Sequence, residues 1–247
     1  MLNLISASFF SSSKNDIGVN QDSVLPPLKI NNGYLFAIAD GVGGYPGGRE
    51  ASNEVIDYLR YNFQGEFNQG FNDLFPKIKN KVIELSSNDK ELSNAASTLT
   101  FCFVKERKIY VGHIGDCRLY YKSGIKLVQI TKDHTMHQHY IEQGIFTAKQ
   151  LKNVKGKNLL TTAISKNFNM EFDIIEIPTD DVIDEFGCMT LFILSDGAHS
   201  FWEKRPRFSI NTMSEPSRYI SSLKKRIENG PPIDDYSAIA VKFCWVN

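Results

Sequence analysis

The stretch that most constrains the fold is residues 34–52, which read YLFAIADGVGGYPGGREAS. An apolar and aromatic run ends at Asp40, a turn rich in glycine and proline follows, and a helical pattern begins at Arg49. Glycine lets the backbone approach a ligand closely because it has no Cβ, and a helix N-terminus offers free N–H groups to an anion. A carboxylate beside such a backbone indicates a cation that bridges to a phosphate. An ordinary strand-to-helix turn fits the same residues, since glycine-rich turns match many patterns by chance.

Apolar periodicity along the rest of the chain predicts both strands and helices. Helical stripes lie at 51–63, 71–85 and 215–228, and Thr147 is a suitable N-cap for a short helix within 133–158. Pro26 and Pro27 predict a break in the chain. Strands are expected at 4–10, 34–39, 97–104, 108–114, 117–121, 126–130, 172–177, 189–194 and 237–246, with those between 97 and 130 forming an antiparallel meander. Grouped strands beside grouped helices indicate an α+β fold, with antiparallel sheet and helices on its outer faces.

The overall composition excludes several classes of protein. Lys plus Arg equals Asp plus Glu, 28 of each, so charge gives no argument for nucleic acid or an acidic membrane surface as partner. No apolar run approaches the roughly 18 residues of a membrane span, and the N-terminus does not resemble a signal peptide. The four cysteines, Cys102, Cys117, Cys188 and Cys244, form no C-x-x-C pair and predict a reduced, cytoplasmic protein.

Aspartates stand at the ends of several apolar strands. Asp40, Asp116 and Asp196 each end one, Asp22 ends a polar loop, and Asp234-Asp235 precedes the last strand. If these strand ends converge, two carboxylates about 4 Å apart repel by about 4 kcal/mol at an effective dielectric of 20. No matching set of Arg or Lys stands at the same strand ends. Hard divalent cations such as Mg²⁺ or Mn²⁺ would supply the missing charge, activate a water and orient a phosphoryl group.

Other sites for the same chemistry have weaker support. The chain has no C-x5-R, no G-x-x-x-x-G-K-[ST] and no H-E-x-x-H pattern. His134, His137 and His139 could bind a metal, but a solvated loop carrying imidazoles is the simpler interpretation. A structural calcium site is a further alternative, although EF-hand spacing is absent.

Taken together, these residues resemble the type 2C family of metal-dependent protein serine/threonine phosphatases, in its compact bacterial form. The resemblance covers nearly the whole chain in the family's order of motifs. The matching segments are Asn20-Gln21-Asp22, Asp40-Gly41-Val42-Gly43-Gly44, Gly115-Asp116-Cys117-Arg118, Asp133-His134-Thr135, Ser195-Asp196-Gly197 and Asp234-Asp235-Tyr236-Ser237.

The resemblance implies a β-sandwich of two antiparallel sheets, flanked by helices on both outer faces and forming one catalytic domain over 1–247. It implies two metal ions, Mn²⁺ or Mg²⁺, and a possible third. Asp40 is expected to bridge two ions, with the Gly41 carbonyl and, through water, Asp22 at the first. Asp196 and Asp234 are expected at the second and Asp116 at the third. Asp22, Asp40 and Asp196 are the expected catalytic residues, Asp235 is not an expected ligand, and 135–158 corresponds to the family's flap.

The chain also departs from the family's pattern near the phosphate. Ile17 stands where relatives often have a phosphate-contacting Arg, Val42 replaces a His of some relatives, and 162–165 read TAIS in place of R-x-[IL]-G. Lys14 is therefore the expected phosphate-binding residue. The expected partner is a phosphorylated protein, such as one phosphorylated by an opposing serine/threonine kinase, and the expected state is a monomer. A non-catalytic phosphoprotein-binding module on the same fold is the alternative function.

Overall fold

Two five-stranded sheets form the centre of the computed structural model, which describes residues 2–15, 18–43, 46–65, 71–151, 156 and 159–245. The first sheet has the order β1 (Leu2–Ser12), β12 (Tyr236–Trp245), β11 (Cys188–Leu194), β7 (Arg118–Ser123), β8 (Lys126–Gln129). The second has the order β10 (Asp173–Pro178), β6 (Lys108–Ile114), β5 (Leu99–Lys105), β3 (Gly33–Asp40), β2 (Asp22–Ile30). A short third sheet pairs β4 (Ala96–Ser97) with β9 (Ile164–Ser165), and all these pairings are antiparallel.

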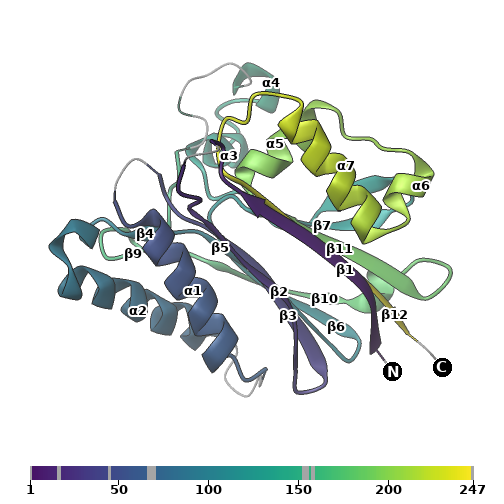
Figure 1. Cartoon of the computed structure of the whole chain (residues 1–247), viewed down its shortest axis with the longest axis horizontal. Coiled ribbons are helices and arrows are strands. Elements are labelled where there is room, and N and C mark those ends of the chain that lie inside the picture. The colour runs from purple at the N-terminus through teal and green to yellow at the C-terminus, as the bar shows by residue number, and fades with distance from the viewer. Residues whose placement is uncertain are drawn as a thin grey trace.

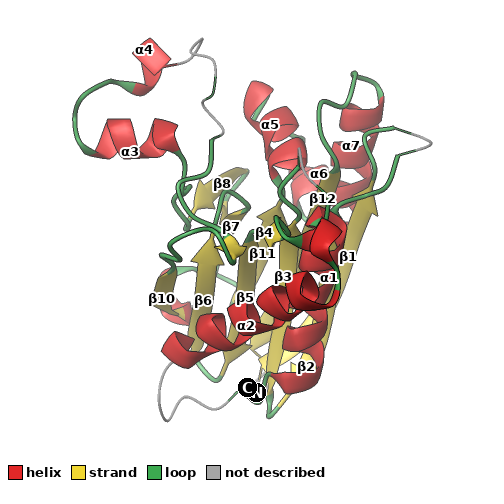
Figure 2. Ribbon diagram, turned by 90° about the vertical axis from the view of Figure 1, so that its left-hand side faces the viewer, coloured by secondary structure: helices red, strands yellow, loops and turns green. Residues whose placement is uncertain are grey.

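Helices cover the outer face of each large sheet (Figure 1). The helices α1 (Gly48–Asn62) and α2 (Leu74–Asn88) pack on the second sheet, while α5 (Asp196–Lys204), α6 (Ile210–Met213) and α7 (Pro216–Glu228) lie with the first. Short helices α3 (Met136–Glu142) and α4 (Ala148–Leu151) stand apart at one end of the sandwich (Figure 2). None of the described helices is long and apolar enough to cross a membrane. The predicted α+β sandwich is confirmed.

The strand β3 shows why the sandwich has three apolar layers. Its side chains alternate, as they must in a strand. Leu35 and Ala37 pack with the helices α1 and α2, whereas Phe36 and Ile38 belong to the core between the two sheets. Both sets are fully buried, so β3 is apolar throughout until it reaches Asp40. Asp40 is the first residue of that strand to meet solvent at the end of the sandwich.

Two sequence-based expectations about strands are wrong. Pro26 and Pro27 do not break the chain but lie within β2, where the pairing with β3 shifts between Leu25 and Leu28. The strand tolerates proline because it lies at a sheet edge and is irregular at that point. The strands between 97 and 130 do not form one meander either, because β6 and β7 belong to different sheets. The chain crosses at Gly115, whose φ of 107° is a backbone conformation that favours glycine.

The sequence also failed to predict α5, which begins at Asp196 directly after β11. The pair Asp196-Gly197 is a usual turn signal. Here the glycine serves close packing, because a Cβ on Gly197 would lie 2.1 Å from the Asp235 carbonyl oxygen. The helix start is therefore pressed against the residues that precede β12.

The expectation of four reduced cysteines is contradicted. Cys188 and Cys244 lie directly opposite each other on β11 and β12 and form a disulfide. Strand register brings the two together although 56 residues separate them, and the sequence offered no sign of this register. Cys102 and Cys117 are free and buried.

Candidate active site

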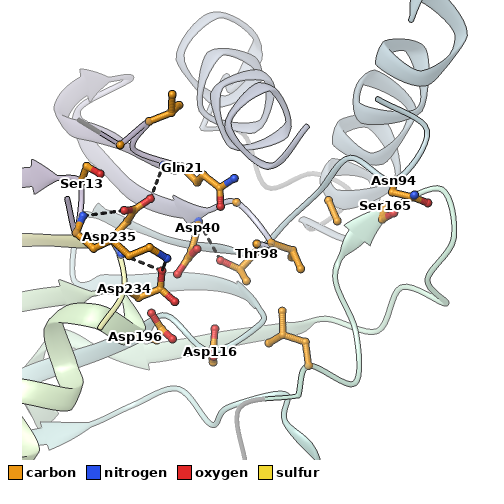
Figure 3. A pocket seen from close by; sticks show the side chains of 18 of the residues that line it. Ser13, Gln21, Asp40, Asn94, Thr98, Asp116, Ser165, Asp196, Asp234 and Asp235 are labelled. Carbon is orange, nitrogen blue, oxygen red and sulfur yellow. Dashed lines mark hydrogen bonds and ion pairs between the residues drawn. The ribbon is translucent and has the colours of Figure 1, made fainter. Parts of the chain in front are cut away.

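The strand ends predicted to converge do so at one end of the sandwich. Asp40 ends β3, Asp116 lies in the crossing from β6 to β7, Asp196 opens α5, and Asp234 precedes β12. These four carboxylates line one cavity of about 1000 Å³, together with Gly41, Lys14 and Asp235 (Figure 3). Asp22 lies directly opposite Asp40 on the neighbouring strand and is buried. The structure therefore brings together every site residue that the sequence predicted.

Burial and mutual repulsion make these carboxylates weak acids. The pKa of Asp22 is raised from 3.8 to about 7, first by burial and then by the charges of Asp196 and Asp235. The pKa of Asp196 is raised to about 6, by burial and by Asp234. Burial also raises the pKa of Asp40 and Asp116 well above the usual value, with the neighbouring carboxylates adding to it. The surrounding protein therefore does not supply enough positive charge to keep all of these carboxyl groups ionised at neutral pH.

The donor set fits hard divalent cations. Asp22 Oδ1 and Asp196 Oδ1 are buried side-chain oxygens without a hydrogen-bond partner among the described residues. Such oxygens are costly unless they bind something, and carboxylate oxygens suit Mg²⁺ and Mn²⁺. Among the described residues, no three carboxylate, imidazole or thiol side chains surround a common point closely enough to hold an ion by themselves. Ions here would complete their shells with backbone carbonyls and water, as magnesium usually does.

Two cations lie beside the carboxylates, contrary to the expectation that the strand ends have no cationic partners. Lys14 Nζ lies 3.3 Å from Asp234 Oδ1. Arg118 donates two hydrogen bonds to Asp133, of 2.7 and 2.6 Å, and also contacts Glu203. Its charge lowers the pKa of Asp116, but less than burial and the neighbouring acids raise it. Each cation contacts other carboxylates, Lys14 at Asp234 and Arg118 at Asp133 and Glu203, so the acidic excess at Asp22, Asp40 and Asp196 persists.

Asp234 and Asp235 have different surroundings. Asp235 is 6% exposed, and its two oxygens accept the backbone N–H groups of Lys14 and Gln21 at 2.9 and 2.8 Å. The Asp234 side chain is 53% exposed and faces Lys14, and its charge acts on Asp196. Asp235 therefore anchors the loop that precedes β2, while Asp234 is the carboxylate available to an ion. This supports, without testing, the prediction that Asp234 is the ligand.

Several residues that fix the carboxylates were missed by sequence reasoning. Thr98 Oγ1 accepts the Asp40 N–H at 3.0 Å, and the Thr98 N–H donates to the Asp40 carbonyl at 2.8 Å. Ser195 Oγ donates to Asp22 Oδ2 at 2.9 Å and accepts the Ser237 N–H. Ser195 belongs to a motif that the sequence flagged, whereas nothing marks Thr98. Gly41 is also required, since a Cβ there would lie 2.3 Å from the Gly48 carbonyl oxygen.

The histidine-rich segment is a structural element and not a solvated loop. His134 Nδ1 accepts the Gly115 N–H at 3.2 Å, and its Nε2 lies 3.1 Å from Asp173 Oδ2. His134 thus holds the turn that presents Asp116. Thr147 caps α4 as predicted, because its Oγ1 accepts the Gln150 N–H at 3.3 Å. Of the flap 135–158, residues 152–155 and 157–158 are outside the described residues, as is Ile17, so the flap's role stays a prediction.

Comparison with known proteins agrees with this geometry. The sequence model of the family described as Protein phosphatase 2C matches residues 13–229. A putative protein phosphatase of Mycoplasma genitalium is 30% identical over 215 residues, covering 80% of each chain. The chain belongs to the protein phosphatase 2C family.

Solved structures of this family show the same fold. The serine/threonine phosphatase Stp1 from Staphylococcus aureus superposes with a TM-score of 0.82 at 19% identity, covering 99% of this chain and 96% of that one. The catalytic domain of the serine/threonine protein phosphatase PstP, solved in complex with two manganese ions, gives 0.75 at 20% identity, with 99% and 100% covered. These two structures confirm the predicted fold. The family match confirms the predicted phosphatase class.

Proposed function

We propose that this chain hydrolyses phosphoserine and phosphothreonine in proteins, with Asp22, Asp40 and Asp196 as its catalytic carboxylates. The observation that carries the proposal is the set of acids with raised pKa values gathered at one cavity. Oxygens of Asp22 and Asp196 also lack a hydrogen-bond partner among the described residues. A binding module without activity would have no use for that repulsion. When bound, divalent ions supply a water of lowered pKa and orient the phosphoryl group for in-line attack.

Different residues of the chain would bind each of the two ions and a possible third. Asp40 would lie between two ions, with the Gly41 carbonyl and Asp22 at the first. Asp196 and Asp234 would hold the second, and Asp116 a third. Thr98 and Ser195 fix the orientation of Asp40 and Asp22 through the hydrogen bonds described above. Because carboxyls of raised pKa hold protons in the metal-free protein, loading the site releases protons.

We assign the phosphate contact to Lys14. Its ammonium lines the cavity and is 44% exposed, so it can reach a phosphate oxygen while remaining near Asp234. A charge-assisted contact of this kind would replace part of what an arginine at position 17 would supply. The substrate phosphate would then lie between the ions and Lys14.

The decisive experiment is hydrolysis of a phosphothreonine peptide by metal-stripped protein, before and after addition of manganese. Phosphate release should be absent in chelator and should return with manganese or magnesium. Titration of the stripped protein with manganese at pH 6 should also release protons, as a pH indicator reports. Undiminished turnover after metal stripping would refute the metal-dependent mechanism, and binding of phosphopeptide without turnover in manganese would favour the non-catalytic alternative.

Finer assignments belong to the same proposal. We propose that 1–247 act as one catalytic unit, since residues of both large sheets build the central core. We also propose that the protein acts as a monomer. We place the protein in the cytoplasm, acting on proteins phosphorylated by a serine/threonine kinase. Disulfides are rare in that compartment, so the Cys188–Cys244 disulfide would be an exception there. Thiol counting on protein extracted under acid quench tests this point.

A further inference from the structure

The cavity extends well beyond the carboxylates. Part of its lining is a group of uncharged residues that we call the neutral arm: Asn94, Ala96, Leu159, Ser165, Asn167 and Phe168. Figure 3 shows Asn94 and Ser165 on the far side of the pocket from Asp234 and Asp235. A volume of about 1000 Å³ exceeds what one phosphorylated side chain needs, and lies at the upper end of ordinary ligand pockets.

The neutral arm is tied firmly to the catalytic carboxylates. Ser97 bridges to Gly41, and β4 pairs with β9 through Ala96 opposite Ser165. Asn167 Nδ2 donates to Asn94 Oδ1 at 3.1 Å and to the Ser93 carbonyl at 3.4 Å. These contacts connect much of the arm to Gly41, the residue after Asp40, and so position it beside a substrate that is bound at the carboxylates.

The arm also presents apolar side chains to solvent. Leu159 is 62% exposed and Phe168 is 36% exposed, and both face the cavity that holds the catalytic carboxylates. The amides of Asn94 and Asn167 beside them can bind a peptide backbone. A phosphoprotein whose phosphate reaches the carboxylates brings the residues that flank the phosphoresidue into the same cavity. A flanking residue of such a substrate is therefore the occupant that fits this wall.

We propose that the neutral arm is a specificity subsite that binds an uncharged apolar side chain next to the phosphoresidue. This inference rests on the proposed function. An apolar neighbour removes Leu159 and Phe168 from water. An acidic neighbour would lose its hydration there, because none of the described residues that form the arm carries a positive charge. Lys79 donates to the Phe168 carbonyl at 2.9 Å but is not part of the cavity lining. The result is a preference among phosphoprotein substrates that the carboxylates themselves do not provide.

Two phosphothreonine peptides of equal length, flanked either by leucine or by glutamate, test this with manganese present. We expect kcat/KM to be about tenfold higher for the leucine peptide, the scale of one apolar contact in a specificity pocket. Phe168→Ser should lower the value for the leucine peptide alone and leave p-nitrophenyl phosphate unchanged, because that substrate reaches only the carboxylates. Phe186→Ser is the matched control, since Phe186 is 79% exposed and is not part of the cavity lining.

A reversal of preference separates recognition from a merely structural role. Leu159→Lys places a cation in the arm at an exposed position, so it should raise kcat/KM for the glutamate peptide above that for the leucine peptide. Equal kcat/KM for the two peptides in the unaltered protein would overturn the inference while leaving the proposed function intact. Absence of turnover with peptides and p-nitrophenyl phosphate alike would overturn the proposed function and this inference with it.

Discussion

Replacing Asp22 by asparagine should stabilise the metal-free protein at pH 8, and by more than it does at pH 5. The substitution keeps the shape of the side chain and an oxygen to accept the Ser195 hydroxyl. It places an amide where Asp22 Oδ1 lies without a partner, which carries a cost that does not depend on pH. Comparing two pH values cancels that cost and isolates the charge of Asp22.

The magnitude follows from the pKa of Asp22, which folding raises from 3.8 to about 7. A raised acid pKa means that the folded state holds the proton longer than the unfolded state. Stability is then fully present below about pH 4 and is lost as pH rises through about 7. At about 1.36 kcal/mol per pKa unit, the loss is about 4 kcal/mol in full, of which about 2–3 kcal/mol falls between pH 5 and pH 8. Asp22 titrates together with its neighbouring carboxyl groups, and the asparagine variant lacks the contribution of Asp22 to this pH-dependent loss of stability.

Urea denaturation in chelator at the two pH values measures the effect, provided that the m-values agree. The free energy of unfolding of Asp22→Asn minus that of the unaltered protein should increase by about 2–3 kcal/mol from pH 5 to pH 8. Asp57→Asn is the control, because this carboxylate is exposed on α1 and forms a surface ion pair with Arg60. If this difference in the free energy of unfolding is the same at pH 5 and pH 8, ionisation of Asp22 does not destabilise the folded protein.

Three further predictions concern the carboxylates and their cation. Asp40→Asn should lower kcat by about a hundredfold or more, since even outer-shell changes cost 10–100-fold, while unfolding in chelator shows a fold at least as stable as before; wild-type kcat would remove Asp40 from its bridging role. Lys14→Ala should raise KM more than it lowers kcat and should reduce the manganese needed for half-maximal rate, because an ammonium no longer competes at Asp234; if neither quantity moves, Lys14 does not grip the phosphate. Asp234→Asn should raise the manganese requirement with little loss of stability, whereas Asp235→Asn should cost about 1–3 kcal/mol in urea with the manganese requirement unchanged; the opposite pattern would exchange their roles.

The sequence predicted the fold class and the aspartates that gather at one cavity, because both depend on local signals. Apolar runs that stop at Asp40, Asp116 and Asp196 mark strand ends, and one end of an antiparallel sandwich collects them. The long helices α1, α2 and α7 follow from apolar stripes of a period that strands do not share. None of these predictions required knowledge of which strand lies beside which.

Features that depend on pairing between distant segments could not be predicted in this way. The Cys188–Cys244 disulfide needs the register of β11 and β12, and the crossing at Gly115 needs the assignment of β6 and β7 to separate sheets. Prolines 26 and 27 are acceptable only because β2 has no neighbour on its outer side among the described strands. The helix α5 was not predicted because Asp196-Gly197 is typical of a turn. Gly197 is needed for another reason, since the backbone at Asp235 packs closely against it.

The adjacent pair Asp234-Asp235 shows where a motif stops and structure must decide. Both residues are acidic, both line the cavity, and either could hold an ion by composition alone. Each carboxylate oxygen of Asp235 accepts a backbone N–H, one from Lys14 and one from Gln21. Asp235 thereby fixes a loop that lies more than two hundred residues earlier in the chain. That same contact brings the Lys14 ammonium to 3.3 Å from Asp234. The second acid of the pair therefore sets the position of the phosphate-binding cation, and the first is left to meet the metal. An asparagine at 235 keeps only one of the two acceptors, so its effect on turnover should follow the position of Lys14 and not the occupancy of the ions.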